Sequence, residues 1–318
     1  MPINSTQSIA AVIHLLLISG LGFILYRRRA ITSENNDFLV KLLVYVTFPC
    51  LSFSTVVEYF RPEAYRQLGV LMTASLGLFV IGLLFGALGA LLCGRLPYKR
   101  EMLALVALQN CAYIPMNITL FISDEQLRNT MLLYVLLYTA GFNLWMWSIG
   151  PFYIFRKEGE PFRLSHLLSP PVWSVLLGIA IVFTGLHRFI PGVVIASVKT
   201  IGQSSFFLSL LVLGCSLAVI ELPVFKNKVI ICSLFLLTLL KLLVVPFAVH
   251  HVNLYLHLQN FIGYFILIEA AMPSATSLAV VGAYRNANIS YLSAGIFLST
   301  IASLVTTPVW LSLYSYYK

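Results

Sequence analysis

The amino-acid sequence predicts an all-α polytopic membrane protein with ten transmembrane helices in two inverted five-helix repeats. Three observations support this fold class. Hydrophobic residues make up 59% of the 318 residues and charged residues only 10%, whereas a soluble domain carries about 25% charged residues. The mean hydropathy is +0.92, so lipid must be the solvent of most of the surface. The third observation is that a proline interrupts an apolar stretch at corresponding places in the two halves.

Apolar runs of roughly the 20 residues that a helix needs to cross a bilayer define the spans. They lie near 7–26, 38–57, 67–92, 101–122, 127–153, 170–186, 203–220, 228–249, 260–282 and 290–315. Five spans per half is an odd number, so the second half must enter the membrane from the opposite face. We therefore expect a first repeat at 7–153, a cytoplasmic linker at 154–169 and an inverted second repeat at 170–316.

The orientation follows from the basic residues, because cytoplasmic loops carry an excess of Lys and Arg. One side of the membrane receives twelve: Arg27, Arg28, Arg29, Arg95, Lys99, Arg100, Arg156, Lys157, Arg163, Lys226, Lys228 and Arg285. The other side receives six: Arg61, Arg66, Arg128, Arg188, Lys199 and Lys318. This bias predicts a multi-pass protein of the plasma (inner) membrane with both termini outside. The first apolar run precedes its arginines, the reverse of a secretory signal, so we expect it to be retained.

The two interrupted stretches predict a binding site. They are residues 109–119, around Pro115, and residues 269–277, around Pro273, and the two prolines are 158 positions apart. A helix broken in lipid exposes backbone groups, which is tolerated where they line a cavity, and paired broken helices mark the binding site of many transporters. Freed amides at a helix start favour an anion.

Polar side chains at the two breaks would add hydrogen-bond donors to such a site. The candidate substrate-binding residues are Asn110, Tyr113, Pro115, Asn117, Pro273, Ser274, Thr276 and Ser277, and Gln109 and Asn143 are further candidates for its lining. The alternative is that these small polar residues only satisfy the broken backbone.

Two ionisable residues lie within the predicted spans and are candidates for coupling. Glu269 is the one acidic residue in a predicted membrane interior, and an intramembrane carboxyl is a functional candidate by default. It could carry a proton, or it could be a neutral hydrogen-bonding residue. Lys241 could balance Glu269 or the substrate, or it could snorkel to the interface. The five cysteines and the outer histidines lack metal-ligand spacing, so we expect no metal and no cofactor.

Several segments resemble the auxin efflux carrier family, which includes the plant PIN-formed carriers and many bacterial permeases. Segment 269–277, followed by Tyr284, segment 292–300 and Pro308, is similar to the last two helices of that family. Segments 42–49, 170–171, 213–218 and 241–246 are similar to earlier helices. The likeness covers nearly the whole chain, and the short middle loop resembles the bacterial members.

The resemblance implies a ten-helix fold in which the fourth and ninth helices break and cross at mid-membrane beside the substrate. It implies organic anions such as auxin, malonate and other carboxylates as substrates. Helices one, two, six and seven resemble the family's scaffold and dimer surface, and the other helices its mobile transport unit, so a homodimer is expected. In plant members an asparagine directly follows the crossover proline, whereas here Met116 follows Pro115. Whether Asn110 or Asn117 faces the ligand is therefore open.

The predicted function is secondary active transport of a small organic anion by an elevator type of alternating access, coupled to protons or driven by the membrane potential. A membrane-embedded enzyme would need clustered catalytic residues, and a single intramembrane acid argues against one. The glycine-rich stretch 82–94 lacks the Lys and Ser/Thr of a phosphate-binding loop, and no basic soluble face exists for nucleic acid. A receptor that binds the anion without moving it is the remaining alternative.

Overall fold

A computed structural model of the chain describes residues 5–61, 65–94, 96–145, 154–155, 170–218, 228–258, 261–278, 282 and 287–312. Over these residues the regular structure is helical, with no β-strand. The α-helices are α1 (Ser5–Arg27), α2 (Ser33–Leu42), α3 (Phe48–Tyr59), α4 (Tyr65–Leu92), α5 (Lys99–Ala107), α6 (Tyr113–Thr119), α7 (Glu125–Leu144), α9 (Pro170–Phe183), α10 (Gly192–Ala218), α11 (Lys228–Leu239), α12 (Val245–Tyr255), α13 (Phe261–Ala270) and α15 (Ile289–Ser312).

The helices have the length and composition of membrane spans. Within the described residues, five are long and apolar enough to cross a bilayer, namely Ser33–Tyr59, Arg66–Leu92, Gly192–Ala218, Lys228–Tyr255 and Ile289–Ser312. Shorter apolar helices cover Ile13–Arg27, Val172–Phe183 and Phe261–Ala270. These helices confirm a multi-pass, all-helical membrane protein.

One predicted boundary is wrong. The seventh span was expected at 203–220, but α10 already begins at Gly192, directly after Pro191. The first turns of α10 contain Lys199, Thr200 and Gln203, which interrupt the apolar run and so conceal the true start. Proline before a helix is compatible with its first turn, since the first amides have no intrahelical partner.

Two long spans contain a π-helical turn just before a proline. Leu43–Thr47 joins α2 to α3 ahead of Pro49, and Leu240–Val244 joins α11 to α12 ahead of Pro246. Proline has no amide hydrogen and clashes with the preceding turn, so an α-helix cannot pass through it without adjustment. The wider π turn provides that adjustment and lets each span continue.

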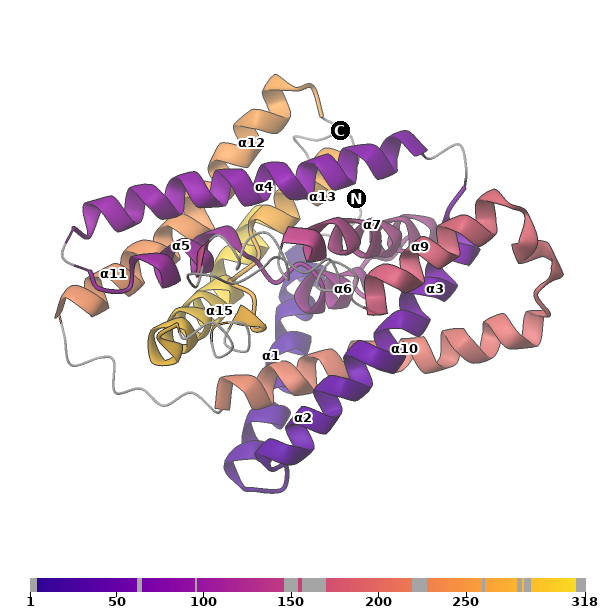
Figure 1. Cartoon of the computed structure of the whole chain (residues 1–318), viewed down its shortest axis with the longest axis horizontal. Helices are drawn as coiled ribbons and strands as arrows, with labels where there is room; N and C mark the ends of the chain where they lie inside the picture. The colour runs from indigo at the N-terminus through magenta and orange to yellow at the C-terminus, as the bar shows by residue number, and fades with distance from the viewer. Residues whose placement is uncertain are drawn as a thin grey trace, which may run out of the picture.

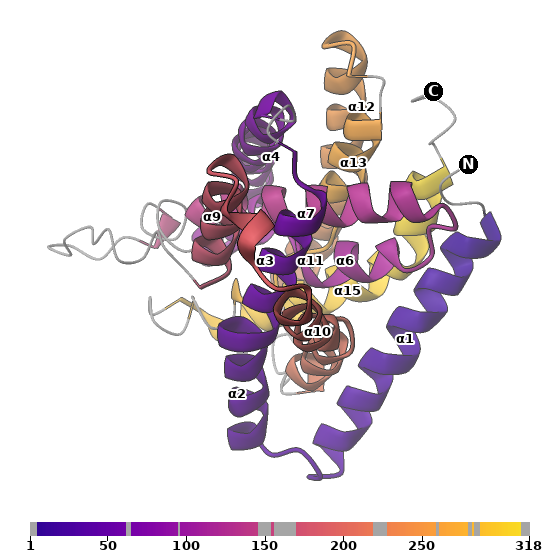
Figure 2. The same ribbon diagram turned by 90° about the vertical axis from the view of Figure 1, so that its right-hand side faces the viewer.

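The helices pack in two sets. In the first, the scaffold group, α1 packs along α10, and α3 packs against α9 and α10. In the second, the crossover group, α4 packs against α5 and α7, and α15 packs against α5 and α11. This group also includes α6, which packs against α7 and touches α10 of the scaffold group, and α13 with the broken segment that follows it, because α13 packs against α4 and α15. Figure 1 shows α3, α9 and α10 on the right and α5, α11 and α15 on the left. Figure 2 shows α1 running obliquely along one edge of the molecule.

Glycines allow the helices of the scaffold group to approach closely. A Cβ atom on Gly22 of α1 would overlap the carbonyl oxygen of Leu211 in α10, and one on Gly214 of α10 would overlap the carbonyl oxygen of Ser19. A Cβ on Gly202 would lie 2.5 Å from the backbone nitrogen of Leu51 in α3. Small residues at such crossings drive helix association in lipid, where no hydrophobic force pulls helices together.

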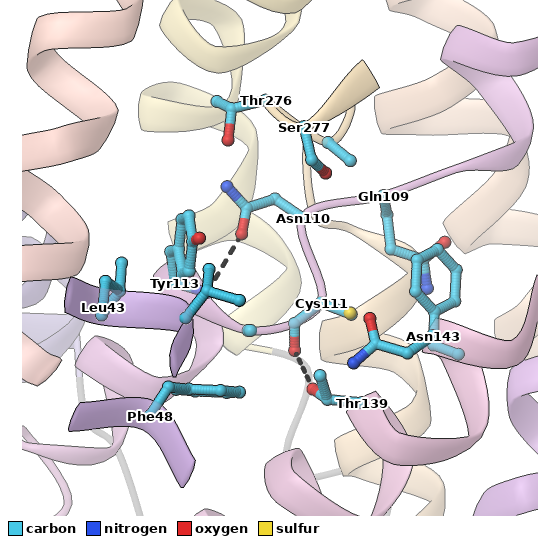
Figure 3. A pocket seen from close by; sticks show the side chains of 14 residues that line it. Leu43, Phe48, Gln109, Asn110, Cys111, Tyr113, Thr139, Asn143, Thr276 and Ser277 are labelled. Atoms are coloured by element: carbon cyan, nitrogen blue, oxygen red, sulfur yellow. Dashed lines mark hydrogen bonds between the residues drawn. The ribbon is translucent and has the colours of Figure 1, made fainter. Parts of the chain in front are cut away.

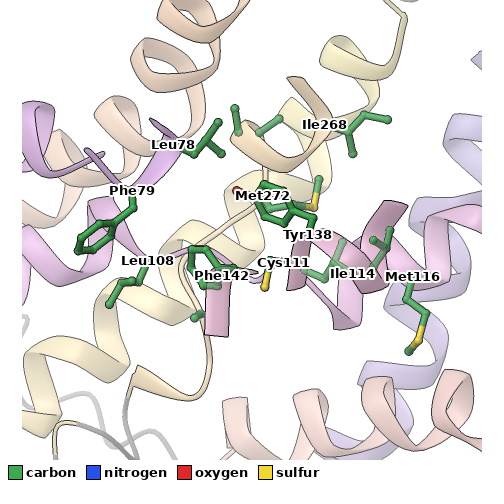
Figure 4. Packing of buried hydrophobic residues seen from close by; sticks show 14 of the residues in the cluster. Leu78, Phe79, Leu108, Cys111, Ile114, Met116, Tyr138, Phe142, Ile268 and Met272 are labelled. Carbon is green, nitrogen blue, oxygen red and sulfur yellow. The ribbon is translucent and has the colours of Figure 1, made fainter. Parts of the chain in front are cut away.

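The buried apolar cluster extends through the molecule and includes the points where helices are interrupted. Leu108, Cys111, Met272 and Tyr138 belong to this cluster and are buried, and Figure 4 shows Cys111 and Met272 close to Tyr138. Many large apolar side chains on α1, α4 and α10 are instead exposed on the outside of the molecule. This arrangement fits a protein whose outer surface faces lipid.

Candidate functional site

The first break separates α5 from α6. Helix α5 ends at Ala107, Leu108 is extended, and α6 begins at Tyr113. The break therefore precedes Pro115, which lies in the first turn of α6. A proline is tolerated there because its missing amide hydrogen would have no intrahelical acceptor. The side-chain oxygen of Asn110 accepts a hydrogen bond from the amide of Tyr113 at 3.1 Å, which caps the new helix.

The second break follows α13, which ends at Ala270. Residues 271–277 are not helical, and Pro273 lies within this stretch. The Ser274 hydroxyl donates to the carbonyl oxygen of Leu105 at 2.7 Å, and its amide donates to the hydroxyl of Ser299 at 3.2 Å. Both breaks therefore occur in the stretches that the sequence indicated, although the first lies upstream of its proline.

The two broken segments cross and pair with each other. Gln109 and Ser274 form an isolated antiparallel bridge. The amide of Asn110 donates to the carbonyl oxygen of Pro273 at 2.8 Å, and the amide of Ala275 donates to that of Leu108 at 3.0 Å. Each segment thus provides hydrogen-bond partners for backbone groups of the other. Non-helical backbone at membrane depth is tolerated only when its polar groups have such partners.

A cavity of about 110 Å³ lies against this crossing and is called the crossover cavity below. Its lining residues are Leu43, Val44, Phe48, Gln109, Asn110, Cys111, Ala112, Tyr113, Thr139, Phe142, Asn143, Ala275, Thr276 and Ser277. Figure 3 shows Asn110 facing the space below Thr276 and Ser277, with Tyr113 beside it. The lining is uncharged, and it combines amide and hydroxyl groups with aromatic side chains. Because drug-sized ligands fill about 300–1,000 Å³, this space suits a ligand of few atoms.

The structure brings four of the eight predicted substrate-binding residues together. Asn110, Tyr113, Thr276 and Ser277 line the crossover cavity, as do the further candidates Gln109 and Asn143. Pro115, Asn117, Pro273 and Ser274 do not line it. Pro273 and Ser274 serve the pairing of the two broken segments instead.

Asn117 has a structural partner outside the cavity. Its amide nitrogen donates to the carbonyl oxygen of Tyr113 at 2.9 Å and to the hydroxyl of Ser209 in α10 at 3.0 Å. Asn117 is fully buried. It therefore joins α6 of the crossover group to α10 of the scaffold group, while Asn110 is the asparagine at the cavity.

Glu269 lies in the last turn of α13, immediately before the second break. Its side chain is 0% exposed, and neither carboxyl oxygen has a hydrogen-bond partner within the described part of the chain. Cys111 and Tyr138 lie within electrostatic range of it. Since Cys111 also lines the crossover cavity, the carboxyl lies next to the cavity wall. A buried carboxyl without a hydrogen bond is unfavourable and so calls for a functional explanation.

Lys241 does not reach an interface, so the snorkelling alternative is wrong. Its side chain is 1% exposed, and its Nζ donates to the carbonyl oxygen of Val106 in α5 at 2.9 Å. Lys241 lies within electrostatic range of Glu269, although no direct ion pair between them occurs among the described residues. Lys241 lies in the π turn Leu240–Val244, and its side chain points inward toward α5, which hydropathy does not reveal.

Eight lining residues were not predicted from the sequence, namely Leu43, Val44, Phe48, Cys111, Ala112, Thr139, Phe142 and Ala275. Leu43, Val44 and Phe48 come from the π turn between α2 and α3 and from the start of α3, and Thr139 comes from α7. The Thr139 hydroxyl donates to the carbonyl oxygen of Cys111 at 3.1 Å and so fixes the first broken segment. The proline at position 49 inside an apolar run was the one available signal for the α3 contribution.

Comparisons with known proteins agree with this architecture. The model of the membrane transport protein family matches residues 7–164 and 154–311, one match in each half, as an internal repeat predicts. An uncharacterized transporter of Methanothermobacter thermautotrophicus is 24% identical over 315 residues, covering 96% of this chain and 97% of that protein. An uncharacterized transporter of Methanocaldococcus jannaschii is 26% identical over 144 residues, covering 44% of each. The chain belongs to the auxin efflux carrier family of membrane transport proteins.

Proposed function

We propose that this transporter carries a small carboxylate anion and holds it in the crossover cavity. The observation that carries the proposal is the position of the cavity, directly against the crossing of two interrupted helices. Its wall offers the side-chain amide of Asn110 and the hydroxyl groups of Thr276 and Ser277. Hydrogen bonds from neutral donors to an ionised acceptor are stronger than neutral pairs, so these groups favour an anion.

The backbone strengthens this preference. The amides of Thr276 and Ser277 make no backbone hydrogen bond within the described part of the chain, so they are available as donors beside the side chains. No acidic residue lines the crossover cavity, and the neighbouring carboxyl of Glu269 carries no negative charge when it is protonated. The aromatic rings of Phe48, Tyr113 and Phe142 provide the apolar wall that an organic acid requires for its hydrocarbon part.

The movement proposed is an elevator motion of the crossover group against the scaffold group, in a fold of two inverted five-helix repeats, residues 7–153 and 170–316. The cavity lies at the boundary between the two packing groups. Leu43, Val44 and Phe48 belong to the scaffold group, and the other lining residues belong to the crossover group. A ligand held mainly by the crossover group would travel with it when that group slides along the scaffold, which exposes the same site to either face of the membrane.

Glu269 and Lys241 are the proposed coupling residues. Glu269 lies beside the crossover cavity without a hydrogen-bond partner among the described residues, and Lys241 lies within electrostatic range of it. A carboxyl that is protonated in one state of the transport cycle and ionised in another would link the anion to a proton. The hydrogen bond of Lys241 to Val106 would let the lysine sense the state of α5, which ends at the first break.

The test is uptake of radiolabelled carboxylates into proteoliposomes. Acetate, malonate, benzoate and indole-3-acetate are offered with an imposed proton gradient, and protein-free liposomes set the background. We expect uptake of at least one acid, and strong reduction in Asn110→Ala. Asn35→Ala is the matched control, because it removes the same amide from an exposed position on α2. If an acid stabilises the protein against heat but is never taken up, the protein is a receptor. If no acid binds or moves, the proposal is wrong.

A further inference from the structure

A second cavity, of about 280 Å³, lies at the other end of α6. It is formed where α3, α6, α7 and α10 meet, and its wall includes Thr55, Thr119, Arg128, Lys199 and Gln203. Unlike the crossover cavity, it contains charged side chains, namely the cations Arg128 and Lys199 and, on the solvent-exposed part of the wall, the carboxyl of Glu125. It also spans the boundary between the scaffold group and the crossover group, because α3 and α10 belong to the first and α6 and α7 to the second.

The two cavities lie in line along the same two helices. Tyr113 at the start of α6 lines the crossover cavity, and Thr119 at its end lines the second cavity. Six residues of α-helix advance about 9 Å. On α7, Thr139 lines the first cavity and Leu132 the second, and seven residues advance about 10 Å. Both helices therefore give the same short separation.

Arg128 is the available cation of the second cavity. Lys199 is engaged, because its Nζ contacts both carboxyl oxygens of Glu58 at 2.8 and 2.7 Å and lies 5.8 Å from the ring centre of Tyr59. The Arg128 guanidinium, by contrast, has no hydrogen bond or ion pair among the described residues. Arg128 is half-buried, so water hydrates only part of its guanidinium group.

We propose that the second cavity is an additional anion-binding site, which receives the carboxylate of the transported acid and uses Arg128 as its specificity-determining residue. The guanidinium presents a planar set of donors that matches a carboxylate, and Asn129 and Gln203 add neutral polar groups to the same wall. The proposal rests on the proposed carboxylate transport. It adds a second binding stage, which the acid occupies before or after the crossover cavity. The two stages are separated by about 10 Å along α6 and α7.

The test uses two thiol reagents of opposite charge, the sulfonate and the trimethylammonium forms of methanethiosulfonate. A Gln203→Cys substitution places the target thiol in the cavity wall, and site-resolved mass spectrometry separates its labelling from that of the native cysteines. Arg128→Gln should lower the ratio of anionic to cationic labelling by at least about threefold, the effect of one charge a few ångströms away in a partly hydrated site. Arg128→Lys should keep the ratio. Arg188→Gln, which removes an exposed arginine outside the cavity, should not change it.

Ligand binding is measured by protection of the same thiol. Acetate, malonate and benzoate at millimolar concentration are compared with chloride at equal ionic strength, in vesicles of phosphatidylcholine alone and of phosphatidylcholine with phosphatidylglycerol. At least one free acid should slow anionic labelling with Arg128 present but not in Arg128→Gln. Protection by phosphatidylglycerol alone would assign the cavity to a lipid headgroup and overturn the proposal. Equal protection in Arg128→Gln, or none from any acid, would also overturn it.

The outcomes for the two cavities are separable. If the parent protein takes up no carboxylate but the labelling ratio and protection depend on Arg128, carboxylate transport fails as a function while the second site stands as an anion site. If uptake proceeds and depends on Asn110, but labelling ignores Arg128, the transport proposal stands and the second site is refuted.

Discussion

Two asparagines near the first break differ in their surroundings and therefore in their expected roles. Asn110 faces the crossover cavity, whereas Asn117 bonds to Ser209 in α10. Asn110→Ala should weaken carboxylate binding about ten- to a hundredfold, as expected for a lost hydrogen bond to a charged group of roughly 1.5–3 kcal/mol. Asn117→Ala should instead destabilise the protein by about 1 kcal/mol and leave affinity close to that of the parent.

The two effects are separated by measuring both quantities on each purified variant. Affinity comes from isothermal titration with the acid that the parent binds, and stability comes from the midpoint of thermal unfolding in detergent. A fall in affinity confined to Asn117→Ala would reverse the assignment. It would mean that Asn117, two positions after Pro115, binds the ligand in a state with a different helix arrangement.

A substitution of Glu269 tests whether the transport of the acid is coupled to a proton on this carboxyl group. Glu269→Gln keeps the size of the side chain and its hydrogen-bonding capacity but cannot titrate. We expect this variant to bind the acid normally, because Glu269 does not line the crossover cavity, yet to lose the response of uptake to an imposed pH gradient. Glu34→Gln, an exposed substitution on α2, is the matched control. Gradient-driven uptake that persists unchanged in Glu269→Gln would leave this carboxyl with a structural role only.

At the scale of the helices, α1 and α10 provide a stability test with an internal control. Gly22 of α1 faces the backbone of Leu211, with no room for a methyl group, whereas Gly20 on the same helix has nothing within 4 Å. Gly22→Ala should destabilise the fold by about 1–3 kcal/mol, because the helices must separate to admit the methyl group. Gly20→Ala should be neutral or stabilising, since alanine favours a helix over glycine by up to about 1 kcal/mol.

Thermal unfolding of the purified variants measures this difference, and the parent sets the reference. Equal midpoints for Gly22→Ala and Gly20→Ala would show that α1 and α10 do not meet at the distance given by the structure. A loss confined to Gly22→Ala would support a rigid scaffold group, against which the crossover group can move.

The helix breaks illustrate what sequence can and cannot predict. Proline and polar residues in an apolar run indicated both interrupted stretches. Such residues are unfavourable in lipid unless the helix is broken there and its backbone is buried in protein or lines a cavity. The position of the first break was not predictable, since Pro115 is compatible both with ending a helix and with starting one. The pairing of Gln109 with Ser274 joins segments far apart in sequence, and no local pattern encodes it.

The role of Lys241 was beyond sequence reasoning for a different reason. A lysine in an apolar span can snorkel if its stem points along the lipid boundary, and hydropathy does not tell which way the helix faces. The π turn at Leu240–Val244 shifts the angular position of every residue after it. Lys241 itself lies inside this turn, and its hydrogen bond to Val106 joins two segments far apart in the sequence, which no local pattern predicts.

At the scale of the whole molecule, the proposed orientation can be tested across the broken span alone. Helix α5 has 9 residues and α6 has 7, which together advance about 24 Å. The non-helical residues 108–112 supply the remainder of a hydrocarbon core of about 30 Å. Arg100, at the start of α5, and Gln126, at the start of α7, should therefore lie on opposite faces of the membrane. The positive-inside bias places Arg100 in the cytoplasm.

Single cysteines at these two exposed positions test both claims, in a background where the five native cysteines are replaced by serine or alanine. An impermeant maleimide should label Gln126→Cys in intact cells and Arg100→Cys only after permeabilisation. The opposite pattern would invert the whole protein and place both termini inside, without affecting the crossing of the broken segments. Labelling of both positions from one face would contradict the predicted inverted-repeat topology, because α5 and α6 would then form a re-entrant loop. Each half would contain an even number of spans, and the second repeat could no longer be inverted relative to the first.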